Sequence, residues 1–165
     1  MIRVSYNLPD WLSDRSRKAF QLANQEAHRL HHRALGTEHL LLGLSKEGIS
    51  PGAWALRFSG FDLAWLRSQV ERCHPRGDDV AVLPGALPYA SDLTAYVERI
   101  SGSTAESAQS VTPQQLLAKL IREPDSRVGY ILKRRWISWW LLRWLLRGVA
   151  EPGAAGVSPD SPPTI

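Results

Sequence analysis

The sequence contains very little cysteine: Cys73 is the only one in 165 residues. A chain with one cysteine forms no intramolecular disulfide and no cysteine-rich zinc site. Disulfide-free chains are typical of reducing compartments, so we expect a cytoplasmic protein. The first eleven residues hold charges and Pro9 where a signal peptide needs an unbroken apolar segment, so we expect no export.

Nucleotide-binding motifs and strand patterns are also missing. The sequence contains neither GxxxxGK[ST] nor GxGxxG, which excludes a P-loop NTPase and a Rossmann enzyme. β-branched residues are sparse, and apolar and polar residues do not alternate over a length that would form a strand. We therefore expect an all-α fold.

Charge and hydropathy add two limits. The chain has 20 Lys and Arg against 16 Asp and Glu, a net charge of +4 that suits many kinds of soluble domain. A membrane-spanning helix needs about 20 apolar residues. The most apolar segment, 136–146, is shorter and is interrupted by Arg143, so we expect no membrane span.

Helix-start residues and apolar spacing predict four helices over residues 10–73. Ser, Thr and Asp side chains accept hydrogen bonds from the free amides of a first turn, and proline is favoured at the first helical position. Glycine often ends a helix. The predicted starts are at Ser13, Thr37, Pro51 and Asp62, and the predicted ends are at the 31–36 loop, Gly48, Gly60 and Cys73.

The second half repeats this pattern. Leu40-Leu41 and Leu116-Leu117 are 76 residues apart, which indicates two tandem four-helix repeats. The predicted starts are at Ser91, Pro113, Ser126 and Ser138, with Gly102 ending or interrupting the first helix and Arg147 ending the last. We expect one domain over residues 1–148, made of repeat one (10–73), a linker (74–87) and repeat two (88–148). Residues 149–165 are expected to form a disordered tail rich in Pro and Gly.

Histidines are concentrated just before the second predicted helix. His28 and His32 have the i, i+4 spacing of metal ligands on a helix, but the sequence contains no HExxH motif. We expect no metal, no cofactor and no catalysis. A small metal-dependent hydrolase that uses His28, His32, Glu38 and His39 is kept as an alternative. We interpret Cys73, beside His74, as an ordinary thiol.

The segment Gly36-Thr37-Glu38-His39-Leu40-Leu41-Leu42-Gly43-Leu44 resembles the Clp repeat of the N-terminal domains of ClpA and ClpC chaperone ATPases. The resemblance extends over about residues 10–147 and is weaker in repeat two. It includes Leu22–Ala27, the loop histidine His32, Gly60–Leu63 and Leu87–Tyr89. It implies a pseudo-two-fold helical domain that recognises proteins. Because the ATPase modules are missing, it further implies an accessory or adaptor factor whose partners are a Clp ATPase, its substrates or its adaptors.

The resemblance also implies a ligand site around Thr37, Glu38, His39 and His32. In some bacterial ClpC proteins the equivalent glutamate of each repeat binds phosphoarginine. Repeat two has Gln114 and Gln115 where repeat one has Glu38 and His39. A neutral amide does not match the strength of a carboxylate–guanidinium pair, so we expect a weaker second site. Alternatively, Glu38 only complements the helix dipole.

His31 stands where the family usually has glycine, so we expect a positive φ at this position.

The segment 133–147 is the most unusual in composition. On a helical wheel Arg143 and Arg147 share a narrow stripe with Trp136 and Trp140, and the remaining apolar residues form a wide arc. One neighbouring layer does not cover such an arc. The helix is then a deeply packed terminal helix, a homodimer or partner interface, or a membrane-surface or nucleic-acid contact. For an interface the candidate residues are Trp139, Trp140, Arg143 and Trp144.

Nucleic-acid binding is the expectation with the least support. Stacking on bases needs exposed aromatic side chains, and most aromatic residues of this segment fall in the apolar arc. We therefore expect no nucleic-acid partner. The alternative function, a basic Trp-containing nucleic-acid-binding or regulatory protein, predicts affinity that falls steeply with salt.

Overall fold

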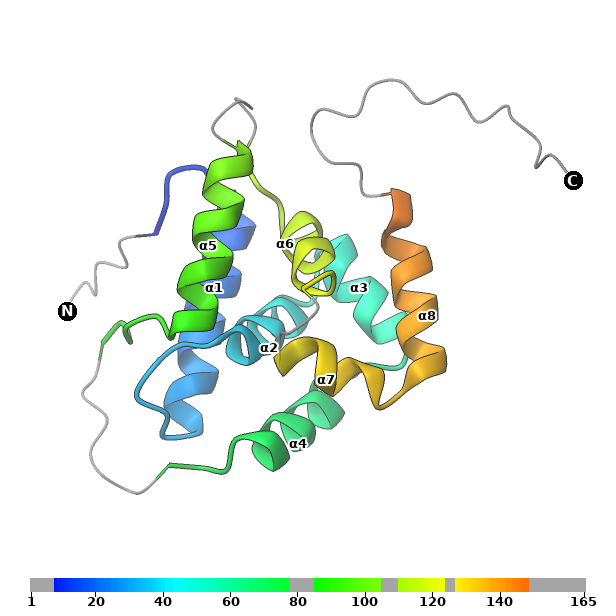
Figure 1. Cartoon of the computed structure of the whole chain (residues 1–165), viewed down its shortest axis with the longest axis horizontal. Coiled ribbons are helices and arrows are strands. Elements are labelled where there is room, and N and C mark those ends of the chain that lie inside the picture. Colours follow the sequence, from blue (N-terminus) through cyan, green and yellow to red (C-terminus); the bar gives the residue numbers. More distant parts are fainter. Residues whose placement is uncertain (1–7, 78–84, 105–109, 124–126, 149–165) are drawn as a thin grey trace, which may run out of the picture.

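The computed structural model describes residues 8–77, 85–104, 110–123 and 127–148. These residues form eight α-helices and no strand, which confirms the all-α prediction (Figure 1). The helices are α1 (Asp14–Arg29), α2 (Thr37–Glu47), α3 (Pro51–Phe58), α4 (Leu63–Cys73), α5 (Ser91–Thr104), α6 (Pro113–Leu120), α7 (Arg127–Lys133) and α8 (Trp136–Leu145). A short 3₁₀ turn, Leu146–Gly148, follows α8.

Most helix ends of repeat one follow their local sequence signals. The Ser13 hydroxyl accepts from the Ser16 amide at 3.2 Å, and the Asp62 carboxylate accepts from the Trp65 amide at 2.7 Å. Gly48 ends α2 with a φ of 75°. The N-cap of α2 is Gly36, so Thr37 is the first helical residue and not the cap that we expected.

Repeat two departs further from the predicted bounds. Helix α5 continues past Gly102 to Thr104, because one exposed glycine costs a helix only about 1 kcal/mol. Helix α8 begins at Trp136 and not at Ser138. The residue before the helix, Arg135, is anchored to repeat one, because its Nη1 donates to the Gly60 carbonyl at 2.6 Å. The predicted start at Ser126, the linker residues 78–84 and the tail 149–165 lie outside the described residues.

The two repeats are related by a reciprocal backbone pairing. Leu12, before α1, forms a parallel bridge with Val111, before α6. Leu35, before α2, forms the matching bridge with Tyr89, before α5. Because α5 and α6 are the counterparts of α1 and α2, exchanging the repeats reproduces both pairs. The predicted pseudo-two-fold arrangement is confirmed.

Helices α1 and α2 approach unusually closely at Gly43. A Cβ atom at this position would lie 2.2 Å from the Ala19 carbonyl oxygen and 2.7 Å from the Ala23 amide. The counterpart of Gly43 in repeat two is Lys119. The pair α1–α2 therefore forms a tight base for the loop that precedes α2, which carries the candidate site.

Candidate functional site

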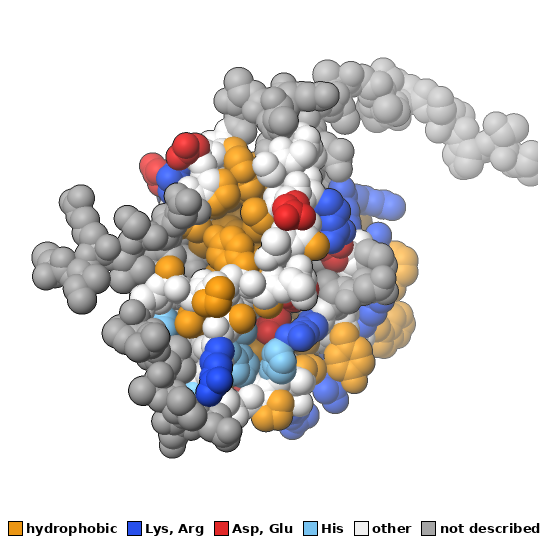
Figure 2. Space-filling model, turned by 60° about the vertical axis from the view of Figure 1, so that its left-hand side comes forward, with side chains coloured by type: hydrophobic (Ala, Val, Ile, Leu, Met, Phe, Trp, Pro, Cys, Tyr) orange, Lys and Arg blue, Asp and Glu red, His pale blue; other side chains and the backbone are white. Residues whose placement is uncertain are grey.

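A pocket of about 630 Å³ opens beside the N-terminus of α2. The loop before α2, the residues after α4 and the first residue of α7 line it, so both repeats contribute. Figure 2 shows histidine side chains gathered on one face of the molecule next to Lys and Arg side chains. Helix α2 begins here because Gly36 leaves room: a Cβ on Gly36 would lie 2.5 Å from a carboxylate oxygen of Glu38.

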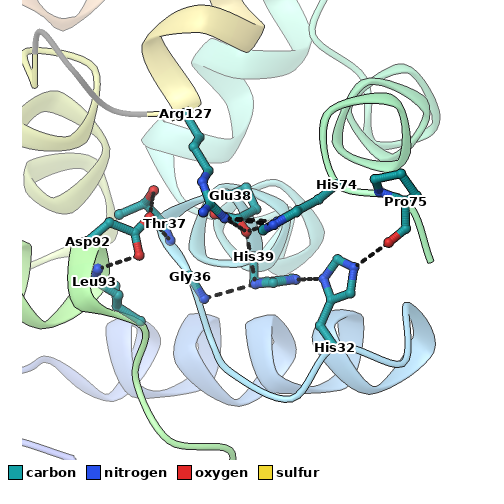
Figure 3. A network of polar contacts seen from close by, with 10 residues as sticks. All are labelled: His32, Gly36, Thr37, Glu38, His39, His74, Pro75, Asp92, Leu93 and Arg127. Carbon is teal, nitrogen blue, oxygen red and sulfur yellow. Dashed lines mark hydrogen bonds and ion pairs between the residues drawn. The ribbon is translucent and has the colours of Figure 1, made fainter. Parts of the chain in front are cut away.

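The Glu38 carboxylate is the centre of this pocket. Its side chain is 2% exposed, and its Oε1 accepts from His74 Nδ1 at 2.9 Å and from Arg127 Nη1 at 3.1 Å (Figure 3). Its Oε2 is buried and has no hydrogen-bond partner among the residues that the structure describes. A buried carboxylate oxygen without a partner is costly. The site therefore holds one unused acceptor beside an ion pair that joins the two repeats.

His39 and His32 belong to a chain of hydrogen bonds that defines which ring nitrogen of each carries the proton. The Gly36 amide donates to His39 Nδ1 at 2.9 Å, so the ring carries its proton on Nε2 and donates it to His32 Nδ1 at 2.8 Å. His32 Nε2 in turn donates to the Pro75 carbonyl at 3.1 Å. Burial lowers the pKa of His39 from 6.5 to about 4, although the Glu38 charge acts in the opposite direction. His39 is therefore a neutral structural support of the α2 start.

Thr37 contacts the second repeat. Its amide and its hydroxyl both donate to Asp92 Oδ2, at 3.2 and 2.7 Å. Burial alone would raise the pKa of Asp92, but the hydrogen bonds from Thr37 and Leu93 and the charge of Arg127 lower it. Asp92 remains ionised and holds α5 against the first turn of α2.

The rim of the pocket is basic. His31 has a φ of 55°, which confirms the expected left-handed conformation, and its Nε2 lies 2.8 Å from Arg76 Nη2. Arg33 and Arg127 also line the pocket, and the Arg127 side chain is half exposed. A buried carboxylate thus lies beneath a rim that carries two arginines, Arg33 and Arg127. This arrangement suits a ligand that carries a cationic group and an anionic group close together.

The equivalent position in repeat two has a different environment. Gln115 repeats the capping role of His39, because its Oε1 accepts from the Thr112 amide at 2.9 Å. Gln114 lies against the first turn of α3, where a Cβ on Gly52 would be 3.1 Å from its Cα. Gln114 does not line the Glu38 pocket. The structure therefore brings together Thr37, Glu38, His39 and His32, and places Gln114 apart from them.

The histidines do not form a metal centre in the described part of the chain, where no group of three or more His, Cys, Asp or Glu side chains is placed to hold an ion. His28 instead donates from Nε2 to the Gly85 carbonyl at 2.8 Å, next to Asn24, whose amide nitrogen contacts the same oxygen at 3.0 Å. These two residues anchor the end of the predicted linker. Cys73 is exposed and is not among the residues that line this pocket.

The four tryptophans of α8 differ in exposure. Trp139 is 8% exposed and belongs to the core, and the Arg143 guanidinium lies 5.0 Å from its ring centre. Trp136, Trp140 and Trp144 are each about two-thirds exposed. The wheel places Trp136 and Trp140 on the arginine stripe, where they are exposed, and Trp139 in the apolar arc, where it is buried. It also places Trp144 in the apolar arc, but this side chain is exposed because α8 packs through a narrow face.

Sequence reasoning did not single out Arg127 and Asp92. Both lie in repeat two and reach a site defined by repeat one, so no local pattern connects them with Glu38. The 76-residue spacing between the repeats aligns Arg127 with Pro51, which indicates only a helix start. Of the helices described here, none is long and apolar enough to span a membrane.

Comparisons with known proteins agree on one family. The model of the Clp repeat N-terminal domain matches residues 11–135. The chloroplastic chaperone protein ClpC3 of Oryza sativa is 35% identical over 119 residues, which are 69% of this chain and 12% of that protein. The negative regulator of genetic competence ClpC/MecB of Bacillus subtilis is 31% identical over 127 residues, 76% of this chain and 15% of that protein. The chain thus spans about an eighth to a seventh of the length of these relatives.

A solved structure shows the same fold. The N-terminal domain of the caseinolytic protease associated chaperone ClpD from Arabidopsis thaliana superposes with a TM-score of 0.65 at 21% identity. The match covers 86% of this chain and 96% of that domain.

Proposed function

Because the chain belongs to the family of Clp repeat N-terminal domains, we propose that it is a non-catalytic protein-recognition module. It acts as an accessory or adaptor factor for a Clp chaperone-protease or its substrates, in the cytoplasm. Its partners are a Clp ATPase, the substrates of that ATPase or their adaptors. The observation that carries the proposal is the buried Glu38 carboxylate with an unused oxygen at the base of a pocket.

The ligand group that fits this carboxylate is a guanidinium. A carboxylate and a guanidinium form two parallel charge-assisted hydrogen bonds, and Glu38 Oε2 supplies the acceptor for the second one. The basic rim would pair with an anionic group on the same ligand. A phosphorylated arginine side chain carries a guanidinium and a phosphate next to each other, and the family resemblance implies the same ligand.

Arg127 is an internal competitor at this site. It contacts Oε1 through one nitrogen, and its side chain is half exposed. A single hydrogen bond of an exposed guanidinium is weaker than a bidentate pair. A ligand guanidinium would therefore displace Arg127, which then lies at the rim and can pair with the anionic part of the ligand.

An affinity capture experiment tests the proposal. The tagged full chain is compared with Glu38→Gln, which keeps the shape of the side chain and removes its charge, and with Gln114→Ala as the matched control. We expect a Clp ATPase, its protease subunit or arginine-phosphorylated proteins to be enriched by the wild type and by Gln114→Ala but not by Glu38→Gln. Equal retention by all three proteins, or retention of no Clp component and no phosphorylated protein, contradicts the proposal.

The exposure of three tryptophans on a cationic helix favours one second function, the binding of single-stranded nucleic acid. A titration with a labelled oligothymidine at several salt concentrations tests it. Binding whose logarithm falls steeply with the logarithm of salt concentration, and that is lost in Trp140→Ala, supports this second function. Binding that does not depend on salt, or that Trp140→Ala retains, contradicts it.

A further inference from the structure

A groove on repeat two is separate from the Glu38 pocket. It has a volume of about 440 Å³ and lies between α8 and the C-terminal end of α6. Its floor is formed by buried apolar side chains, Ala118, Ile121 and Leu146. Trp140 and Trp144, both about two-thirds exposed, form one wall. A groove with an apolar floor and aromatic walls accepts a large apolar side chain.

The charged residues of the groove are all cationic. Arg122, Arg143 and Arg147 line it, and among the residues that the structure describes no Asp or Glu does. The same bias extends along α7 and α8, because the described residues 127–148 contain five Arg and one Lys and no acid. Arg143 is held in place by its stacking on Trp139. A partner that fits this surface therefore presents acidic side chains on both sides of an apolar one.

From this charge pattern and the shape of the groove, we propose that α8 and the end of α6 form a docking surface for an acidic amphipathic segment of a partner protein. The segment places a leucine or an aromatic side chain on the apolar floor against Trp140 and Trp144, and its carboxylates pair with the arginines. Trp and Arg are the residue types that contribute most at protein interfaces. This surface goes beyond the proposed function, because it does not involve Glu38.

Three other occupants fit less well. A second copy of the chain would bring two cationic α8 helices together in a symmetric contact, where like charges repel each other. An anionic membrane contacts a convex face and does not fill a groove. Single-stranded nucleic acid supplies negative charge but no aliphatic side chain for the floor.

The test is a titration of the full chain with a fluorescein-labelled helical peptide that carries Leu and Phe flanked by Glu on one face, followed by anisotropy. A second peptide with Gln in place of Glu is the matched ligand control. Trp140→Ala removes the wall, and Arg147→Glu reverses one charge at the rim. The control variants are Trp54→Ala and Arg57→Glu, which change an exposed tryptophan and an exposed arginine on α3.

We expect Trp140→Ala and Arg147→Glu each to weaken binding about tenfold, as for an interface hot spot, and the α3 variants to change it less than about twofold. We expect the Gln peptide to bind about tenfold more weakly than the Glu peptide. We expect Glu38→Gln to bind the peptide with unchanged affinity. The peptide titration therefore tests the docking surface independently of the Glu38 pocket.

The proposal is overturned if the peptide does not bind, or if it binds all variants equally. Trp140→Ala is also tested for binding to phosphatidylserine vesicles, for binding to oligothymidine and, by analytical ultracentrifugation, for dimer formation. The proposal is overturned if the variant loses one of these properties of the wild type while its affinity for the peptide is unchanged. Circular dichroism of each variant verifies that the helices have formed.

Discussion

The second helix of repeat one begins with a buried glutamate in a pocket, whereas its counterpart in repeat two begins with a neutral glutamine against a neighbouring helix. Glu38 receives Arg127 from the other repeat, and Gln114 meets the backbone around Gly52. The pseudo-two-fold axis relates the contact of α7 with α2 to the contact of α3 with α6. The first contact contains the ion pair of Arg127 with Glu38, whereas Gln114 at the second contact is neutral. Duplicated helices therefore do not imply duplicated sites.

The same difference appears in the interior of the two repeats. Glu26 is buried on α1 and contacts three cations, at 2.6 Å for Arg67 Nη2, 2.9 Å for Lys46 Nζ and 3.0 Å for Arg29 Nε. Its counterpart on α5 is the exposed Ser103. Repeat one thus depends on buried polar networks, whereas repeat two is simpler inside and has its unusual chemistry on the surface of α8.

The largest expected effect is that of Gly43→Ala. The added Cβ would lie 2.2 Å from a backbone oxygen of α1, and neither helix can move without disturbing the core. We expect the free energy of unfolding to fall by at least about 3 kcal/mol, measured by urea denaturation. Lys119→Ala is the matched change in repeat two and is expected to cost less than about 0.5 kcal/mol. Equal effects of the two variants would show that the repeats are equally packed.

Glu26→Gln has the next largest effect. Burial alone would raise the pKa of Glu26, but hydrogen bonds from Arg67, Lys46 and Arg29 lower it from 4.5 to about 2. Removing the charge leaves Arg67 and Lys46 without this carboxylate and Arg29 with only Glu71. We expect a loss of about 2 to 3 kcal/mol, toward the lower end because the cations are partly exposed.

The pH dependence provides a second readout for Glu26. Because its pKa is lower in the folded state, its contribution is present above pH 4.5 and is lost as the pH falls to about 2. Glu26→Gln should remove this part of the acid sensitivity, and Ser103→Ala should leave it intact. An unchanged acid transition in Glu26→Gln contradicts the assignment.

His39→Gln replaces a residue of repeat one with its counterpart in repeat two. The pKa of His39 is lowered from 6.5 to about 4, so the unfolded chain binds a proton before the folded chain does. Wild-type stability should therefore fall between pH 6.5 and 4, by about 1 to 2 kcal/mol. Glutamine can cap α2 as Gln115 caps α6, and we expect a flatter profile over this range in chemical denaturation. A profile as steep as that of the wild type contradicts the prediction.

His31→Gly has the smallest expected effect. His31 has a φ of 55°, which glycine adopts without steric cost, so the free energy of unfolding should rise by about 0.5 kcal/mol. The gain is small because glycine also loses more entropy on folding. Urea denaturation measures it, with Gly48→Ala, at a φ of 75°, expected to change stability in the opposite direction. A loss of stability in His31→Gly would show that its contact with Arg76 outweighs the strain.

Local features of the fold were predictable from the sequence, and contacts between distant segments were not. Ser13, Asp62 and Gly48 mark helix ends because their effect acts within one turn of the chain. The start of α8 depends on the contact of Arg135 with Gly60, 75 residues earlier, which no local pattern reveals. The family motif indicated Glu38 and His39, but the approach of Arg127, 89 residues away, requires the packed structure.

The number of ligand sites per chain tests most directly whether recognition depends on Glu38. Isothermal titration of phosphoarginine into the wild type, Glu38→Gln and Gln114→Ala measures it. We expect one site in the wild type, one site of unchanged affinity in Gln114→Ala, and none in Glu38→Gln. Two sites in the wild type, or binding that Glu38→Gln retains, would contradict the claim that recognition depends on the pocket of repeat one.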